Sequence, residues 1–272
     1  MVNELHLDLD KKSRPRIGVA LGGGSARGFT HFGVLSVLEE AGIPIDVVAG
    51  TSAGALMGAF YSAGMPLHLI DELAQTMSWG RAVRFVLSAK GFVCLDPLAA
   101  WMRETLGDLH FEDLTTTFAC VATDLQSGQT VVLDSGPLAP AVQASCSIPG
   151  IITPVWLNGH LLGDGGVTNN LPVSVARQLG ADYVIGVDIF EPNLEWPWLG
   201  PFGRGLAALE IMVEHAGGGT KTADCLIAPD LSGYSYIRFS HRQELVDRGR
   251  QAASDCLPTI QQVLQIRIAP SA

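Results

Sequence analysis

Short runs of consecutive apolar residues alternate along this chain with longer stretches in which apolar positions recur every three or four residues. Runs of the first kind predict buried strands, and stretches of the second kind predict helices. The predicted strands are 17–21, 47–50, 119–124, 130–134, 182–189 and 225–228. Because strands and helices alternate, we expect an α/β fold in which helices cover a mostly parallel sheet.

Turn residues and helical spacing add further elements to this pattern. Residues 154–162 are typical of a β-hairpin with a two-residue Asn-Gly turn. One helix is predicted to follow the first glycine cluster and to end at Ala41-Gly42. Others are predicted at 53–63, 206–213 and 241–256.

No linker-like run, repeat or low-complexity block divides the chain. Residues 1–15 are polar, and the predicted strands begin directly after them. At 272 residues the chain is long enough for one large α/β domain with a sizeable core. We therefore expect a polar N-terminal tail over 1–15 and a single domain over 16–272.

One serine stands between two glycines where the second predicted strand meets the next helix. The residues there are Gly50-Thr51-Ser52-Ala53-Gly54. This G-x-S-x-G pattern is typical of a nucleophile elbow, a sharp turn that exposes the serine hydroxyl at a helix N-terminus. It is also compatible with a glycine-rich turn in which Ser52 caps the helix. Ser52 is therefore a candidate nucleophile.

A glycine cluster, Gly22-Gly23-Gly24-Ser25-Ala26-Arg27-Gly28, follows the first predicted strand and precedes a helix. Backbone N–H groups in such a loop suit an anion, either a dinucleotide pyrophosphate or the oxyanion of an acyl-transfer intermediate. The dinucleotide fingerprint G-x-G-x-x-G fails, because Arg27 stands where its third glycine belongs. The next strand also ends without an acidic residue, and a Walker lysine is absent. We interpret the cluster as an oxyanion loop.

A third cluster, Gly163-Asp164-Gly165-Gly166, follows the predicted hairpin. A carboxylate among apolar and glycine neighbours is poorly solvated, and this raises its pKa toward the value that a general base requires. Taken alone, Asp-Gly-Gly is also typical of an Asx-type turn. Asp164 is therefore a candidate base whose assignment depends on the other two clusters.

The three clusters, in this order, closely resemble the patatin-like phospholipase family, strongly over residues 16–190. Residues 122–128 and 144–150 match the family as well. The resemblance implies a patatin-like three-layer α/β/α sandwich with a mostly parallel central sheet, and it favours the small bacterial members that stand alone. Carried over position by position, it implies that Ser52 is the nucleophile and Asp164 the catalytic base. It also implies that Gly22, Gly23, Gly24 and Arg27 form the oxyanion loop.

The resemblance implies a serine acyl hydrolase, a lipase or esterase acting as a phospholipase or lysophospholipase through an acyl-enzyme intermediate. No metal or other cofactor is expected, because a Ser–Asp dyad with an oxyanion loop needs none and no acidic cluster resembles a calcium loop. Two alternatives stay open. One is an α/β-hydrolase-type triad that uses His215 or His241 with Asp164. The other is a non-catalytic lipid-binding regulator that keeps the fold.

Composition narrows the class of partner and compartment. The net charge of −10 argues against nucleic acid as a partner. Five scattered cysteines without metal-ligand spacing are typical of free thiols in a reducing compartment. Neither an apolar leader nor a run of about 20 apolar residues is present. We expect a cytoplasmic protein that acts on a lipid or ester substrate and that meets the membrane only at its surface.

Two surface segments bear on that contact. Residues 79–90 combine aromatic and cationic side chains, and residues 194–202 place three aromatics between prolines. Each is a candidate lid or membrane-contact surface. Each is also a candidate for ordinary packing over the sheet or for a homodimer contact. Acyl chain length, headgroup and position of cleavage are left open by the sequence.

Overall fold

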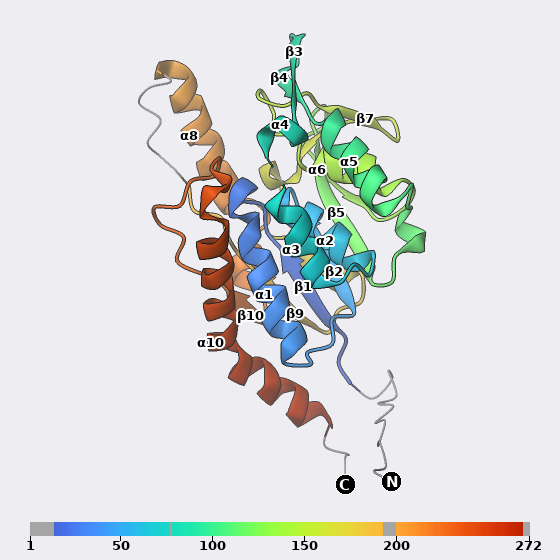
Figure 1. Ribbon diagram of the computed structural model, residues 1–272, viewed down its shortest axis with the longest axis vertical. Helices are drawn as coiled ribbons and strands as arrows, with labels where there is room; N and C mark the ends of the chain where they lie inside the picture. The colour runs from blue at the N-terminus through green and yellow to red at the C-terminus, as the bar shows by residue number, and fades with distance from the viewer. Residues whose placement is uncertain (1–13, 77, 193–199, 269–272) are drawn as a thin grey trace.

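A computed structural model, which describes residues 14–76, 78–192 and 200–268, has an eight-stranded sheet at its centre (Figure 1). The predicted tail over 1–15 lies almost entirely outside these residues. The strand order is β10-β9-β1-β2-β5-β8-β7, and β6 pairs with β5. The parallel strands are β1 (Ile17–Leu21), β2 (Val47–Thr51), β5 (Thr117–Asp124), β9 (Tyr183–Val187) and β10 (Cys225–Ile227). The antiparallel ones are β6 (Thr130–Leu133), β7 (Val155–Leu157) and β8 (His160–Asp164).

Helices cover both faces of this sheet unequally. The larger layer comprises α1 (Phe29–Glu40), α2 (Ala53–Ser62), α3 (Leu67–Gln75), α5 (Asp96–Leu106), α6 (Leu138–Ser145) and α10 (Arg242–Ile268). The other face is covered by α7 (Val173–Gln178), which contacts the short α9 (Gly219–Thr222). This arrangement confirms the predicted α/β/α sandwich. The last helix extends well beyond the predicted range of 241–256, and Ile260 and Leu264 in this added part are buried in the core.

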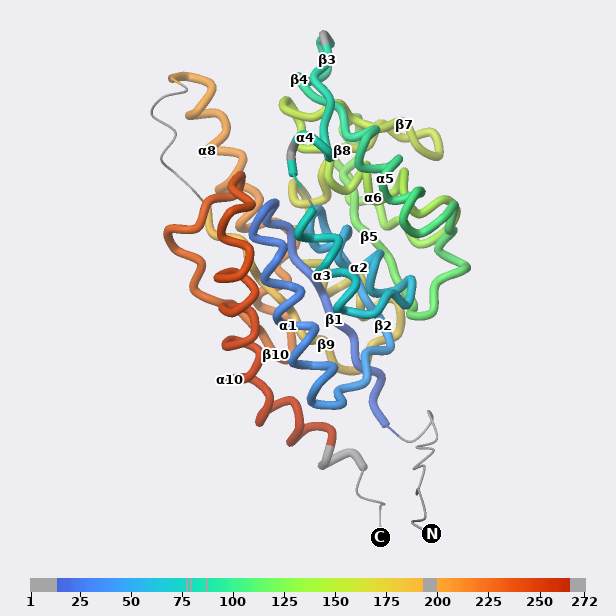
Figure 2. Tube along the Cα trace, in the orientation of Figure 1, coloured from blue at the N-terminus to red at the C-terminus, as the bar shows by residue number. Residues whose placement is uncertain are grey.

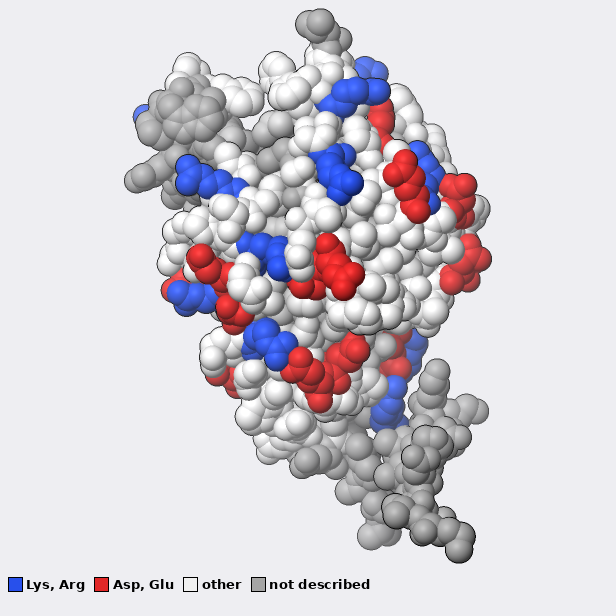
Figure 3. Space-filling model, viewed as in Figure 1, with Lys and Arg blue, Asp and Glu red and all other residues white. Residues whose placement is uncertain are grey.

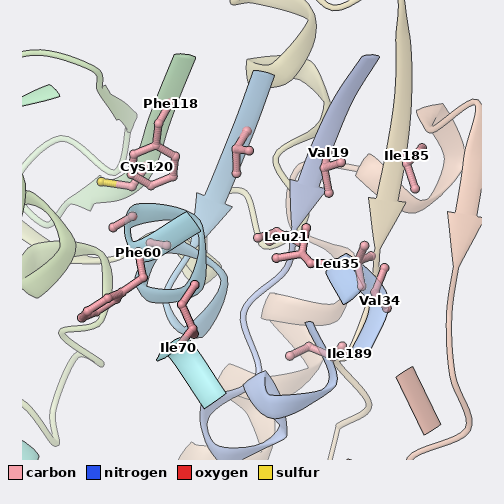
Figure 4. Packing of buried hydrophobic residues seen from close by; sticks show 14 of the residues in the cluster. Val19, Leu21, Val34, Leu35, Phe60, Ile70, Phe118, Cys120, Ile185 and Ile189 are labelled. Atoms are coloured by element: carbon pink, nitrogen blue, oxygen red, sulfur yellow. The ribbon is translucent and has the colours of Figure 1, made fainter. Parts of the chain in front are cut away.

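The alternation of side chains along β1 explains the two layers. Ile17, Val19 and Leu21 point to the larger helical layer, whereas Ala20 points to α7. All four are completely buried. Figure 4 shows Leu21 close to Leu35 of α1. Burial of one such leucine contributes about 1.5–3 kcal/mol to stability, so the strand that ends in the glycine loop is firmly held.

The long strand β5 has two partners, one after the other, along the same edge. Its first part pairs with β2 in parallel, with Val121 opposite Thr51. Its last part pairs with β8 in antiparallel, with Ala122 opposite Asp164. β6 occupies the opposite edge of β5. Because Val121 and Ala122 are consecutive, the ends of β2 and β8 meet, and Ser52 comes next to Asp164.

A second, two-stranded sheet projects from one end of the molecule. It consists of β3 (Arg84–Ser88) and β4 (Gly91–Cys94), preceded by the short helix α4 (Trp79–Ala82). The sequence predicted a single surface segment over 79–90 and no hairpin. The difference arises because the hairpin depends on distant partners: the Phe92 N–H donates to the Ile151 carbonyl at 2.8 Å.

The helix α8 (Gly200–His215) rises at the same end as this hairpin, opposite the far end of α10 (Figure 2). It is longer than the predicted helix over 206–213. Of the candidate surface segment 194–202, residues 194–199 lie outside the described part of the chain. None of the helices in the described ranges is both long and apolar enough to cross a bilayer.

Candidate active site

Ser52 occupies the sharp turn between β2 and α2. Its φ of 53° and ψ of −118° lie in a region that only glycine adopts without strain. This backbone strain costs about 1–3 kcal/mol. Its N–H donates to Ser145 Oγ at 2.9 Å, and this hydroxyl donates to the Val121 carbonyl of β5 at 2.6 Å. The strained serine is thus tied to the strand that also pairs with Asp164. The conformation is that of the predicted elbow.

Gly54 allows α2 to begin directly against the end of β1. A Cβ at this position would lie 2.1 Å from the Leu21 carbonyl oxygen, a distance that real Cβ atoms do not adopt. The contact brings the turn that carries Ser52 against the strand that precedes the glycine loop. The second glycine of the G-x-S-x-G pattern is therefore required for close approach.

Asp164 ends β8 and is only 7 % exposed. Its N–H donates to the Ser147 carbonyl at 2.7 Å, and its Oδ1 accepts the Gly166 N–H at 2.8 Å. Burial raises the pKa of this carboxyl to about 6, although hydrogen bonds from Gly166 and from the Ser52 hydroxyl oppose the rise. The carboxylate is therefore a stronger base than an ordinary aspartate while still being largely ionised at neutral pH.

Ser52 and Asp164 both line one cavity with a volume of about 370 Å³. Its floor also includes Gly23 and Gly24 of the glycine loop. Its walls are almost entirely apolar and come from the hairpin, from the segment before β7 and from α8; they include Val83, Phe85, Val93, Ile148, Ile151, Leu206, Leu209 and Val213. A polar floor below apolar walls suits a ligand with one ester group and an alkyl chain.

The N–H groups of the glycine loop are not equivalent. That of Gly22 donates to the Val187 carbonyl at 3.0 Å, and that of Gly23 donates to the Asn170 carbonyl at 3.3 Å. Those of Gly24 and Ser25 have no acceptor among the described residues, and both residues line the cavity. Ser25 has a positive φ of 50°. Consecutive N–H groups freed in this way can bind an anion.

Arg27 lies behind the loop and is 5 % exposed. Its guanidinium donates to the carbonyls of Tyr234 and Glu191 and to the Tyr236 hydroxyl, and it lies 4.0 Å from the centre of the Tyr236 ring. Its side chain therefore fastens the loop to two neighbouring segments. It is not among the residues that line the cavity with Ser52.

A buried histidine supports the loop from another side. His31 is completely buried, and its Nε2 lies 2.7 Å from the Gly22 carbonyl oxygen. A carbonyl only accepts, so Nε2 carries the proton of a neutral ring. Burial lowers the pKa of His31 to about 4 and keeps it neutral at physiological pH. The contact of His31 with the glycine loop is not evident from the sequence.

Asn170 is a polar group of the site that sequence analysis missed. It lines the cavity and is nearly buried. A Cβ added to Gly23 would lie 2.6 Å from Asn170 Oδ1 and 3.3 Å from Ser52 Cβ. Asn170 Oδ1 and Ser52 Cβ are therefore at most 5.9 Å apart, because that is the sum of the two distances. The signal in the sequence was a polar pair, Asn169-Asn170, shortly after Asp164 in an otherwise apolar stretch.

The two histidines of the alternative triad lie elsewhere. His215 is exposed at the end of α8, and His241 contacts Glu244 and the Tyr234 ring. Within the described residues, no histidine lines the cavity that holds Ser52. In the same part of the chain, no group of His, Cys, Asp and Glu is arranged to hold a metal ion.

Comparison with known proteins agrees with this architecture. The chain is 35% identical over 210 residues to an uncharacterized NTE family protein of Mycobacterium tuberculosis, covering 72% of this chain and 58% of that protein. It is 34% identical over 179 residues to lysophospholipase NTE1 of Coccidioides immitis, covering 64% of this chain and 11% of that protein. The chain thus spans less than two thirds of each of these relatives.

Among solved structures, VipD from Legionella pneumophila has the same fold. It superimposes with a TM-score of 0.53 at 15% identity, over 90% of this chain and 67% of that one. The profile of the family described as patatin-like phospholipase matches residues 19–177, which include the glycine loop, Ser52 and Asp164. The chain therefore belongs to the patatin-like phospholipase family.

Proposed function

We propose that this protein is a serine acyl hydrolase that cleaves carboxylic esters of lipids with a Ser52–Asp164 dyad. The main support is that the two residues line one apolar cavity and that burial raises the pKa of the Asp164 carboxyl to about 6, with the Ser52 hydroxyl among the groups that oppose this rise. The family description names phospholipases, and one relative is named a lysophospholipase. A phospholipid or lysophospholipid is accordingly the proposed substrate class.

In the first half of the reaction, Asp164 accepts the proton of Ser52 Oγ as that oxygen attacks the ester carbonyl carbon. The carbonyl oxygen becomes an oxyanion, which accepts hydrogen bonds from the N–H groups of Gly24 and Ser25. When the intermediate collapses, the bond to the alcohol oxygen breaks and Asp164 returns its proton to the leaving alcohol. The acyl group stays on Ser52.

In the second half, a water molecule attacks the acyl carbon and gives its proton to Asp164. The second tetrahedral intermediate occupies the same pair of N–H groups. Its collapse expels Ser52 Oγ, which takes the proton back, and the carboxylic acid leaves. Among the three glycines of the loop, we assign the donor role to Gly24 with Ser25, because Gly22 and Gly23 donate to protein carbonyls.

Covalent labelling with a fluorophosphonate tests the dyad directly. Intact-protein mass spectrometry of wild type is expected to find one adduct, absent from Ser52→Ala and formed more slowly by Asp164→Asn. His215→Ala is the matched control and is expected to label at the wild-type rate. If the His215→Ala variant is not labelled, the result would favour the alternative triad. Folded wild type that forms no adduct, with or without lipid micelles, would contradict the hydrolase and favour a lipid-binding protein.

A further inference from the structure

The mouth of the cavity lies between the β3–β4 hairpin and α8. Phe85 of the hairpin lines the cavity and yet has 85 % of its surface exposed, so it stands at the rim. Leu206 and Leu209 form the opposite wall from α8. Figure 1 shows both elements projecting beyond the rest of the fold at this end. Whatever contacts this end of the molecule therefore contacts the entrance to the site.

Large apolar side chains are exposed on both elements of the rim. Phe92 of β4 is 62 % exposed and Met212 of α8 is 59 % exposed. The rings of Phe92 and Phe202 lie 6.5 Å apart in an edge-to-face arrangement, which joins the hairpin to the start of α8. Neighbouring exposed aromatics around a cavity mouth are typical of an interaction surface. We call Phe85, Phe92, Phe202 and the cations on the same elements the rim surface.

The charge of the rim surface is opposite to that of the protein. Residues 79–94 contain Arg81, Arg84 and Lys90 and no acidic residue, while the chain as a whole carries −10. Arg204 lies near the start of α8. Figure 3 shows basic side chains around the base of the hairpin, with most acidic ones on that face lying lower.

Acidic groups near the rim surface are few. The first acidic residue after the hairpin, Asp96, is exposed and pairs with Arg84 at 2.9 Å. On α8, Glu210 lines the cavity and Glu214 lies in the last turn, both farther along the helix than Arg204. Cations beside exposed aromatics match the headgroup region of an anionic bilayer, in which aromatic rings enter the interface and basic side chains meet phosphates. A second copy of the chain fits less well, because a two-fold contact would bring the same cations together.

We propose that the rim surface docks on a bilayer that contains anionic phospholipid, with Phe85 and Phe92 inserted among the headgroups. Docking places the cavity mouth against the lipid, so that a substrate molecule enters the site without crossing water. Only this last consequence rests on the proposed hydrolase activity. The docking itself stands on the exposed rings and the charge of the rim surface.

Vesicle sedimentation tests the proposal without interference from hydrolysis when every protein carries Ser52→Ala. One set of vesicles is pure phosphatidylcholine, and the other mixes it with phosphatidylglycerol. We expect binding to the mixed vesicles that is at least about ten-fold stronger and that weakens with salt. Phe85→Ser with Phe92→Ser should lower that binding at least about ten-fold, and Arg81→Glu with Lys90→Glu should abolish the preference for the mixed vesicles.

The matched control is Leu69→Ser with Leu226→Ser, which removes two exposed apolar side chains outside the rim surface. It should bind as the Ser52→Ala protein does. Binding to neither vesicle, or equal binding by the rim and control variants, would overturn the proposal. So would a dimer, detected by analytical ultracentrifugation, that dissociates in the Phe85→Ser, Phe92→Ser variant while vesicle binding is unchanged.

Hydrolysis of a soluble short-chain ester by the protein with Ser52 intact separates this proposal from the proposed function. Turnover of that ester together with a lack of vesicle binding would contradict the docking proposal and support the proposed hydrolase activity. Vesicle binding that depends on Phe85 and Phe92, without turnover of any ester, would support the docking proposal and contradict the proposed hydrolase activity. When both hold, the variant with Arg81→Glu and Lys90→Glu, which do not line the cavity, should lose activity on mixed vesicles and retain it on the soluble ester.

Discussion

The two members of the proposed dyad owe their reactivity to different features of the structure. Ser52 lies in a strained turn with a positive φ, between a parallel strand and the helix that follows it directly in sequence. Asp164 has ordinary backbone angles, φ −53° and ψ 131°, at the end of an antiparallel strand. Its reactivity comes from burial, which raises its pKa. The nucleophile thus depends on local backbone geometry, and the base depends on what the fold packs around it.

The largest effect is expected from Ser52→Ala. Without Oγ no acyl-enzyme forms, so kcat/KM for a soluble ester should fall by more than about 10⁴-fold. The free energy of unfolding should change little, because the hydroxyl is half-buried and the turn is unchanged. Steady-state kinetics with urea denaturation as the stability control measure both. Residual activity above one per cent would mean that Ser52 is not the nucleophile.

Asp164→Asn should affect both rate and stability. Loss of a general base typically lowers the rate about 10²–10⁴-fold. In wild type the native state holds the Asp164 proton more tightly than the unfolded chain, because burial raises the pKa from 3.8 to about 6. The stability associated with this group is therefore complete at low pH and is lost as pH rises through about 6.

The stability part of this prediction has a clear sign. At pH 8 the Asn variant should be more stable than wild type by about 3 kcal/mol, and near pH 3.5 the two should be equal. Urea unfolding across this pH range is the measurement. A difference that stays constant with pH would contradict burial as the cause of the raised pKa.

The pH profile of wild type sharpens the same contrast. Because the base must be ionised, kcat/KM should increase tenfold for each pH unit below about 6 and level off above it. His31 is neutral throughout this range, since burial lowers its pKa to about 4. Its replacement should leave the position of the inflection unchanged. An inflection near 7 would point to an ordinary histidine as the base.

Gly54→Ala should displace the turn that carries Ser52, because it disrupts the packing of α2 against β1. The added Cβ would meet the Leu21 carbonyl oxygen at 2.1 Å, and neither group is a flexible side chain. We expect a loss of about 2–4 kcal/mol in the free energy of unfolding and reduced labelling of Ser52. Gly205→Ala in α8 is the control: its Cβ has no neighbour within 4 Å, and the variant should be neutral or slightly more stable.

The smallest effect is expected from Arg27→Lys. Lysine keeps the charge but cannot reproduce the forked hydrogen bonds to Tyr234 and Tyr236. We expect kcat to fall about ten-fold with little change in KM, because the loop is displaced by a fraction of an ångström rather than removed. A loss as large as that of Ser52→Ala would instead indicate that Arg27 contacts the reacting ester.

Much of the nucleophile side was predictable because its signals are local. The strand, the G-x-S-x-G turn and the following helix lie within a few residues of one another. The hairpin before Asp164 was predictable for the same reason: Asn158 and Gly159 have φ of 51° and 81°, as a two-residue turn of this kind requires. The glycine loop was located correctly from the sequence, but its inward and outward N–H groups could not be distinguished.

The sequence by itself determined the strands of the central sheet, the class of fold and the candidate residues Ser52 and Asp164, because short-range spacing encodes them. Only the tertiary structure decided that consecutive residues of β5 bring these two together, and that Ser145 ties the elbow to the same strand. It also decided the rim of the cavity, which combines the hairpin with α8. The reason is physical: pairing register and burial depend on residues far apart in the chain, and these set where a side chain lies and how readily it titrates.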